Sequence, residues 1–166
     1  MTHTPSKTEL DLGWPSLLEQ LASRCHTLRG AALARDIKPL DSFQAAHRRQ
    51  AEIAEARRLQ DRGEPLSFGG IYDVQTALGR SAKGGVLDPD ELVEMGSTLL
   101  TATRLRRHIL ARVADLPNLV PLASDLAELP EVTGPISDAF DEQRKLKDSA
   151  SPALGGLRSR VNHLLA

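Results

Sequence analysis

Apolar side chains recur along most of the chain at intervals of three and four residues, which is the spacing of one face of an α-helix. The longest stripe runs from Leu92 to Leu116. It covers about seven turns, or roughly 40 Å of helix at 1.5 Å per residue. Asp88 stands before it as an N-cap, Pro89 takes the first helical position, and Glu91 completes a capping box. This pattern predicts one long helix as the spine of the fold.

Shorter stripes predict helices before this spine. One helix follows Gly13, and a second ends before Pro39. A third begins at Asp41, interpreted as an N-cap with Gln44 completing its capping box, and runs to about Arg62. The third helix has few apolar positions among many charges, so we expect it to pack through one narrow side. Those positions are Phe43, Ala46, Ile53 and Ala56.

Glycine and proline separate the remaining elements. Residues 63–72 are predicted as a loop, and a short helix around Asp73–Ser81 is followed by Gly84 as a C-cap. Residues 136–147 end a helix and form a polar turn. A last helix begins at Ser151, and because no stop signal follows it we expect the natural helix to continue past residue 166. Four prolines divide residues 117–135 into short helical pieces: Pro117, Pro121, Pro130 and Pro135.

These elements predict an all-α fold, an irregular cluster of about seven helices around one long central helix. Residues 1–12 are expected to form a flexible lead-in and residues 13–166 one helical segment. The aromatic content of 3% agrees, because sheets favour aromatic and β-branched residues, whereas this chain uses leucine and alanine. If the chain folds compactly, roughly two thirds of the surface of the unfolded chain becomes buried.

Charge and targeting signals restrict the class of protein only broadly. The net charge is −1, so the whole-chain balance indicates neither a nucleic-acid nor an acidic partner. The single cysteine, Cys25, excludes an internal disulfide. The N-terminus lacks the apolar run of a signal peptide, and no stretch is apolar enough to span a membrane. We therefore expect a soluble, cytoplasmic protein with no membrane partner.

The sequence offers no constellation with catalytic chemistry. The segment from Gly79 to Val86 has part of the spacing of a phosphate-binding loop but lacks the lysine and the hydroxyl residue. The five histidines are scattered, and the carboxylates near Asp141 fit a solvated helix end better than a metal site. We predict no catalytic, cofactor-binding or metal-binding residue in this chain.

Arginines cluster on the third helix and on the central helix, where they are candidates for contact with nucleic-acid phosphates. The candidates are Arg48, Arg49, Arg104 and Arg107. A structural alternative stays open, because arginines near helix C-termini also interact with the helix dipole. Aromatic residues that would stack on bases do not accompany them.

The order of several motifs resembles the N-terminal region of the bacterial MutS-II family, the MutS homologues linked to suppression of recombination. The resemblance covers about residues 10–166. Its two most specific parts are the segment FGGIYD at 68–73 and the segment DSASP at 148–152. Weaker matches are LLEQL at 17–21, LARDIKP at 33–39 and AKGGVL at 82–87.

The resemblance implies a non-catalytic helical core and lever segment, placed before the clamp and the ATPase domain of a larger protein. That parent would bind ATP and magnesium, form a homodimer, bind branched or duplex DNA, and carry endonuclease activity. Some family members are linked to stalled ribosomes, so the ribosome or its RNA is a further implied partner. None of the family's ATP-binding or nuclease residues has a counterpart in this chain.

Two features depart from the family pattern. The turn at 141–147 lacks the glycine that family members commonly have, and the central helix contains Gly96, which weakens it by about 1 kcal/mol unless close packing requires it. Two other functions stay open beside the lever. One is a stand-alone helical module that binds a protein partner, and the other is an autonomous nucleic-acid binder.

Overall fold

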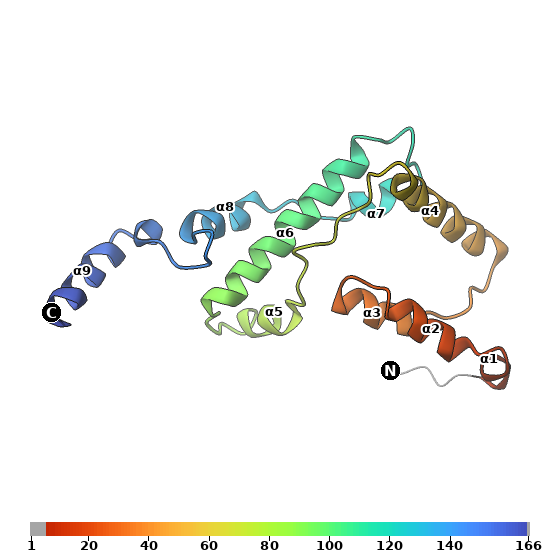
Figure 1. Cartoon of the computed structure of the whole chain (residues 1–166), viewed down its shortest axis with the longest axis horizontal. Coiled ribbons are helices and arrows are strands. Elements are labelled where there is room, and N and C mark those ends of the chain that lie inside the picture. Colours follow the sequence, from red (N-terminus) through yellow and green to blue (C-terminus); the bar gives the residue numbers. More distant parts are fainter. Residues whose placement is uncertain (1–5, 166) are drawn as a thin grey trace.

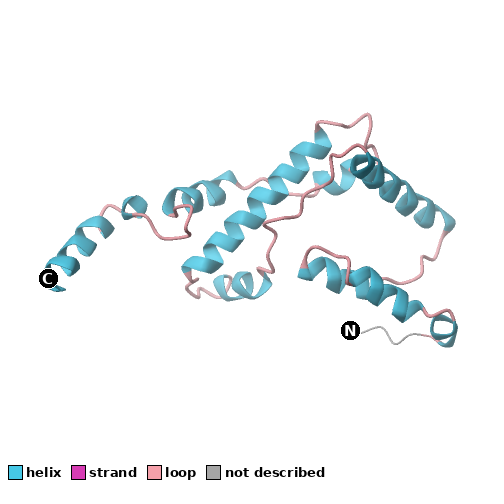
Figure 2. Ribbon diagram, viewed as in Figure 1, coloured by secondary structure: helices cyan, strands magenta, loops and turns pink. Residues whose placement is uncertain are grey.

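The computed structural model describes residues 6–165, and within them the secondary structure is helical (Figures 1 and 2). The prediction of an all-α fold is confirmed. The only extended pairing in this range is an isolated bridge between Phe140 and Leu146. The elements are α1 (Lys7–Asp11), α2 (Trp14–Ala22), α3 (Leu28–Arg35), α4 (Phe43–Asp61), α5 (Gln75–Ser81), α6 (Pro89–Leu110), α7 (Val120–Ser124), α8 (Pro130–Ala139), the 3-10 turn η1 (Asp148–Ala150) and α9 (Leu154–Leu165).

Helix α6 is the predicted spine and begins as expected. Pro89 is its first residue, and the Glu91 carboxylate accepts a hydrogen bond from the backbone N–H of Asp88 at 2.9 Å. The helix ends earlier than predicted, at Leu110, so its 22 residues span about 33 Å. Turns follow over residues 111–115. Pro117 disfavours the helical conformation at Leu116, which nevertheless packs in the core.

The buried core lies at the C-terminal end of α6, where α4 and α7 meet it. Leu59 comes from α4, Ile109 from α6, and Ala123 from α7. Leu116 and Leu119 join them from the connection between α6 and α7. These residues are far apart in sequence, and their packing joins the end of α4 to α6, α7 and the connection between them.

Helix α4 differs from the prediction in its start and in its buried side. The N-cap is Ser42, whose hydroxyl accepts from the backbone N–H of Ala45 at 3.2 Å. The prediction of Asp41 as N-cap, with Gln44 completing a capping box, is therefore wrong, because the helix begins one residue later. Two of the four expected packing residues, Phe43 and Ile53, are 80% and 53% exposed. The helix packs through Glu55 and Leu59 and through Ala56, which was among the predicted residues, because the core contacts only the C-terminal half of α4.

The N-terminal helices form a separate arm, seen at the end of Figure 1 opposite α9. Helices α2 and α3 pack together, α1 packs on α2, and Arg35 forms a bidentate ion pair with Glu19. The lead-in needs a correction, since Lys7–Asp11 form helix α1, which is capped by Ser6. Residues 1–5 of the predicted lead-in lie outside the described residues.

The C-terminal part runs from α8 through a hairpin turn to α9. Pro135 was expected to separate two helical pieces but lies inside α8. Gly134 precedes it and has no Cβ to clash with the proline ring, which removes part of the usual obstacle to a helical residue before proline. Helix α9 contains no buried residue, and it is joined to the rest mainly through η1.

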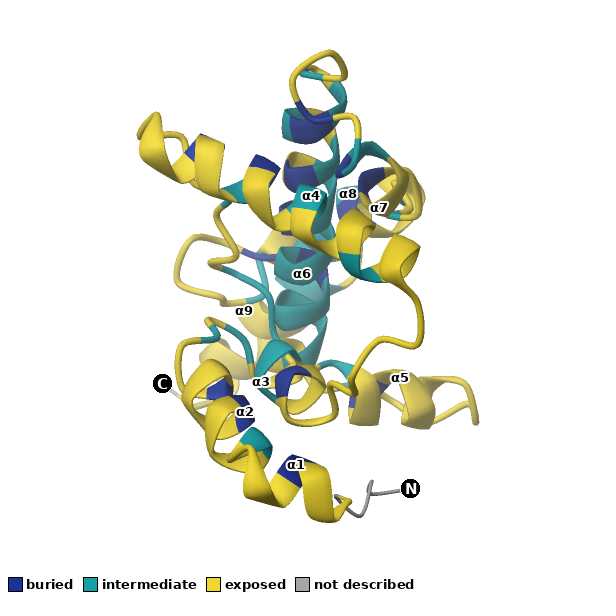
Figure 3. Cartoon of the chain, turned by 90° about the vertical axis from the view of Figure 1, so that its right-hand side faces the viewer, coloured by how far each residue is buried: buried dark blue, intermediate teal, exposed yellow. Residues whose placement is uncertain are grey.

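The chain is much more open than a compact domain of its size. Its accessible surface is 12337 Å², whereas a compact monomer of 18.0 kDa exposes about 8,000 Å². Folding therefore buries about half of the unfolded chain's surface rather than the two thirds expected for a compact fold. Figure 3 shows the buried and half-buried residues along α6 and its neighbours, while α1, α2 and α5 are mostly exposed.

Candidate contact sites and the docked glycine loop

The glycine segment at 68–72 is a loop, as predicted, and it is docked on α6 by three hydroxyl groups. Ser97 donates to the carbonyl oxygen of Gly70 at 2.9 Å, and Thr101 donates to that of Gly69 at 3.0 Å. Thr98 accepts from the backbone N–H of Tyr72 at 3.0 Å. The loop backbone therefore has hydrogen-bond partners along its length on one face of the spine.

Gly70 is required by this close approach. Its φ is +91°, a region that residues with a side chain avoid. A Cβ at this position would lie 2.7 Å from Ser97 Oγ and 2.9 Å from Thr101 Oγ1. The most specific motif of the family resemblance is thus explained as a backbone docking element.

The turn at 141–147 is tied to the same loop. Arg144 donates to the hydroxyl of Tyr72 at 2.7 Å, and its guanidinium carbon lies 5.5 Å from the centre of the tyrosine ring. Arg144 also has a φ of +61°, the only positive value at a non-glycine residue in the described chain. A left-handed conformation costs a residue with a side chain about 1–2 kcal/mol. The contact with Tyr72 offsets part of this cost.

The structure does not bring the four candidate arginines together. Arg48 and Arg49 lie in the first half of α4, the half away from the core junction. Arg104 and Arg107 lie in the second half of α6. Arg49 pairs with Glu52 at 2.8 Å, and Arg104 donates to the hydroxyl of Thr101 at 2.9 Å. A single phosphate-binding stripe through all four is therefore not formed.

Arg107 has a carboxylate partner in Glu128, at 2.8 Å. The hydrogen bond from Arg107 holds the pKa of the Glu128 carboxyl below its usual range, although partial burial acts in the opposite direction. Arg106 supports the fold rather than a ligand site. Its guanidinium donates to the carbonyl oxygens of Ala123, Ser124 and Leu126, at the C-terminal end of α7. Arg106 thus interacts with the negative end of a helix dipole, the structural role that the sequence left open for these arginines.

Sequence reasoning missed the most connected charged residue, Glu55. Its side chain is 1% exposed, and its carboxylate accepts from the backbone N–H groups of Asn118 and Leu119 and from the Asn118 amide, at 2.6–3.1 Å. Glu55 thereby caps the start of α7 from a different helix. No local signal indicates this role, because the two partners are more than sixty residues apart in the sequence.

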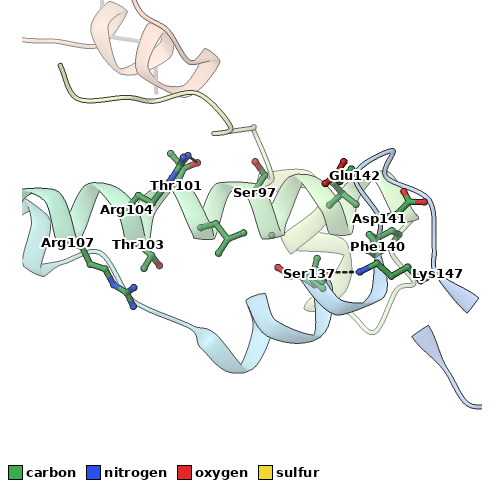
Figure 4. A pocket seen from close by; sticks show the side chains of 14 residues that line it. Ser97, Thr101, Thr103, Arg104, Arg107, Ser137, Phe140, Asp141, Glu142 and Lys147 are labelled. Carbon is green, nitrogen blue, oxygen red and sulfur yellow. Dashed lines mark hydrogen bonds between the residues drawn. The ribbon is translucent and has the colours of Figure 1, made fainter. Parts of the chain in front are cut away.

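A groove of about 910 Å³ runs between α6 and the segment of α8 and its hairpin (Figure 4). Its floor is formed where Gly96 approaches Ile136, since a Cβ on Gly96 would lie 2.8 Å from Ile136 Cγ2. The glycine in the spine is thus needed for helix packing. In Figure 4, Arg107 and Thr103 point from α6 toward the α8 side, and Lys147 reaches Ser137 across the hairpin.

Two other kinds of feature are absent from residues 6–165. No three His, Cys, Asp or Glu side chains gather there as a metal site requires. None of the helices in residues 6–165 is long and apolar enough to cross a membrane. The absence of catalytic and cofactor residues stays a prediction.

Curated proteins named Endonuclease MutS2 are similar to this chain over nearly its whole length. The protein of Symbiobacterium thermophilum is 34% identical over 158 residues, which are 95% of this chain and 20% of that protein. The protein of an Anaeromyxobacter species is 36% identical over 160 residues, again 95% and 20%. The protein of Pelotomaculum thermopropionicum is 34% identical over 151 residues, or 90% and 19%. The chain matches one segment of MutS2 proteins.

The chain spans about a fifth of the length of these MutS2 relatives. The resemblance inferred from the sequence motifs is confirmed at this level. Which region of the MutS2 proteins the segment represents stays a prediction. The chain matches no family model.

Proposed function

We propose that this chain is a non-catalytic helical core and lever segment of a MutS2-type protein, in which it couples the state of an ATPase domain to the clamping of DNA. The match of 95% of the chain to a fifth of each relative carries the proposal. In this parent protein the ATP, magnesium, endonuclease activity and homodimer interface belong to regions outside this segment. Suppression of recombination through branched or duplex DNA is its proposed role, with the ribosome or its RNA as a second target.

The architecture supports a mechanical role. A lever needs rigid elements that are fixed at one end and free to move a distant part. Helix α6 is held at its C-terminal end by the core with α4 and α7, and the docked glycine loop braces its middle. Helix α9 extends away from this frame without burying any residue.

The large accessible surface also supports a segment that packs against other parts of a larger protein. Apolar side chains stay exposed on several helices, and the accessible surface of 12337 Å² is about half as large again as that of a compact monomer of this mass. Such exposed leucines are found on α1, α2, α3 and α9: Leu10, Leu17, Leu33, Leu157 and Leu164.

The first test is the mass of the native gene product in its own cells, measured by immunoblot with an antibody against this chain. A product several times larger than 18.0 kDa supports the MutS2-type assignment. A native product of 18.0 kDa overturns it.

A second test addresses the coupling itself in the full-length parent. Replacing Ser97 and Thr101 with alanine releases the glycine loop from α6. We expect ATP hydrolysis without DNA to stay unchanged and the effect of DNA on hydrolysis to decrease. The matched control, Ser159→Ala on the exposed surface of α9, should leave both rates unchanged. An unaltered DNA effect in the double variant would contradict the lever role.

A stand-alone protein-interaction module is the second candidate function. The apolar stripe of α9 favours it, because Leu157, Val161 and Leu164 are all exposed on one helix. Such a stripe fits a helix partner in either account, so the native mass decides between them.

A further inference from the structure

The segment DSASP at 148–152 is the joint between the hairpin turn and the last helix. Its first three residues form the 3-10 turn η1, and Ser151 after them is extended, with a φ of −147° and a ψ of 154°. Pro152 follows, and α9 begins at Leu154. Residues 151–153 are exposed, so a rotation of the backbone at Ser151 would move α9 without breaking a buried contact. The segment therefore has the form of a hinge.

Helix α9 has little apolar packing to fix its direction. Only Leu154 and Gly155, in its first turn, are half-buried, and residues 156–165 are exposed. The first turn rests on η1, where a Cβ on Gly155 would lie 3.6 Å from the Cβ of Asp148. Because apolar burial is the main favourable term in packing, this small contact leaves the direction of α9 to polar interactions.

The polar interactions come from one arginine in the second turn of α9. Nη1 of Arg158 donates to the carbonyl oxygen of Leu146 at 2.9 Å and to the carboxylate of Asp148. Leu146 belongs to the hairpin, where it pairs with the buried Phe140. Both acceptors precede Ser151 and the donor follows it, so Arg158 spans the hinge. Within residues 6–165, no other side chain of α9 forms a hydrogen bond outside its own helix.

We propose that Arg158 is a latch and Ser151 a hinge, so that α9 turns as one body when Arg158 leaves its two acceptors. The side chains of the ion pair are exposed, by 46% for Arg158 and 69% for Asp148, and exposed pairs are weak and screened by salt. The closed position is therefore favoured by a small factor, about tenfold.

Opening the latch redirects the apolar stripe of α9, because its exposed members Leu157, Val161 and Leu164 move with the helix. The latch is thus a device that sets where this stripe faces. It is a property of the 166-residue chain itself, so its failure would leave the lever function untouched.

The test is a distance measurement between two spin labels, one on α8 and one on α9, by pulsed electron paramagnetic resonance. The labels are attached at Asp138→Cys and Asn162→Cys, both at exposed positions, in a Cys25→Ser background that removes the native thiol. We expect one main distance when Arg158 is present. Arg158→Gln should lower the ratio of molecules at this distance to all others about tenfold, since both hydrogen bonds are lost.

The acceptor and the salt dependence identify the ion pair. In the labelled chain with Arg158 and Asp148, the ratio should fall as sodium chloride is raised from about 0.05 M to about 1 M. Asp148→Asn keeps an acceptor oxygen but removes its charge, so the ratio should fall about threefold and lose its dependence on salt. A ratio that does not depend on salt while Asp148 is present would overturn the proposal.

Arg160→Gln is the matched control, since Arg160 is an exposed arginine of α9 whose side chain bonds to nothing else in the described chain. It should leave the main distance unchanged. The proposal is overturned if Arg158→Gln also leaves it unchanged, or if Arg160→Gln broadens the distances equally. Circular dichroism separates turning of the helix from its unfolding. Broad distances that accompany a loss of the α9 helix signal would mean that Arg158 stabilises the helix without positioning it, which overturns the proposal too.

Discussion

Leucine is buried at the junction of α4, α6 and α7 but exposed on the last helix, α9. At the junction, Leu59 and Leu116 are each 2% exposed. On α9, Leu157 is 53% exposed and Leu164 is 84% exposed, although their spacing along the helix is just as regular. An amphipathic pattern therefore shows that a helix has an apolar face but not whether this chain supplies the surface that covers it.

The largest expected effect separates these two regions directly. Leu59→Ala should destabilise the chain by about 2–5 kcal/mol, because it removes buried methyl groups and leaves a cavity at the junction. Leu157→Ala, the same change on α9, should stay within about 0.5 kcal/mol. Urea unfolding followed by circular dichroism measures both. Equal losses would mean that α9 is covered in solution, for instance by self-association.

The second prediction concerns the charged member of the junction. Glu55→Gln places an amide where two backbone N–H groups now meet a carboxylate, so one of the bonds to Asn118 or Leu119 is lost. We expect a loss of about 1.5–3 kcal/mol, typical of hydrogen bonds to a charged group. Glu19→Gln breaks an exposed ion pair with Arg35 in the N-terminal arm and should cost much less. If Glu19→Gln lowers the free energy of unfolding as much as Glu55→Gln does, the distinction between the buried junction and the exposed N-terminal arm is wrong.

Most helices could be predicted from the sequence, because the residues that start and end them are neighbours along the chain. The start of α6 follows from Asp88, Pro89 and Glu91, and the break after α4 follows from Gly63, whose φ is +76°. The buried side of α4 did not follow, since it is set by residues 118 and 119, far along the chain. The link from Glu55 to Asn118 and Leu119, at the end of the connection between α6 and α7, is equally non-local.

The candidate site was less predictable than the fold. Sequence reasoning selected Arg104 and Arg107 for their charge. In the structure Arg107 is paired with Glu128, and the neighbouring Arg106 caps the C-terminal end of α7. Adjacent arginines on one helix point in different directions and meet different neighbours, so their roles depend on tertiary contacts. His108 was treated as one of several scattered histidines, and only the structure shows that its Nε2 is buried without a partner.

The third prediction compares a glycine of the docked loop with one on an open turn. Gly70 and Gly84 both have positive φ, +91° and +78°, so alanine is strained at either position, by about 1–2 kcal/mol. Only Gly70 faces close neighbours, since nothing lies within 4 Å of a Cβ on Gly84. Gly70→Ala should therefore cost about 1 kcal/mol more than Gly84→Ala, the value of the hydrogen bond from Ser97 that it displaces. Thermal unfolding of both variants measures the difference, and equal shifts would mean that the docking adds no stability.

The smallest effect tests why a glycine stands in the spine. Gly156→Ala in α9 adds a Cβ that meets nothing within 4 Å, so it should stabilise that helix locally by about 1 kcal/mol, detected as slower amide hydrogen exchange. Gly96→Ala gains the same helix propensity but places its Cβ 2.8 Å from Ile136 Cγ2. Overpacking of this kind costs about 1–3 kcal/mol, so the net change should be a loss of about 1 kcal/mol. Removing the clashing atom with Ile136→Ala should reverse the sign of the effect of Gly96→Ala, measured as a double-mutant cycle. If Gly96→Ala stabilises the chain as Gly156→Ala does, α6 and α8 do not pack as closely in solution as the contact between Gly96 and Ile136 requires.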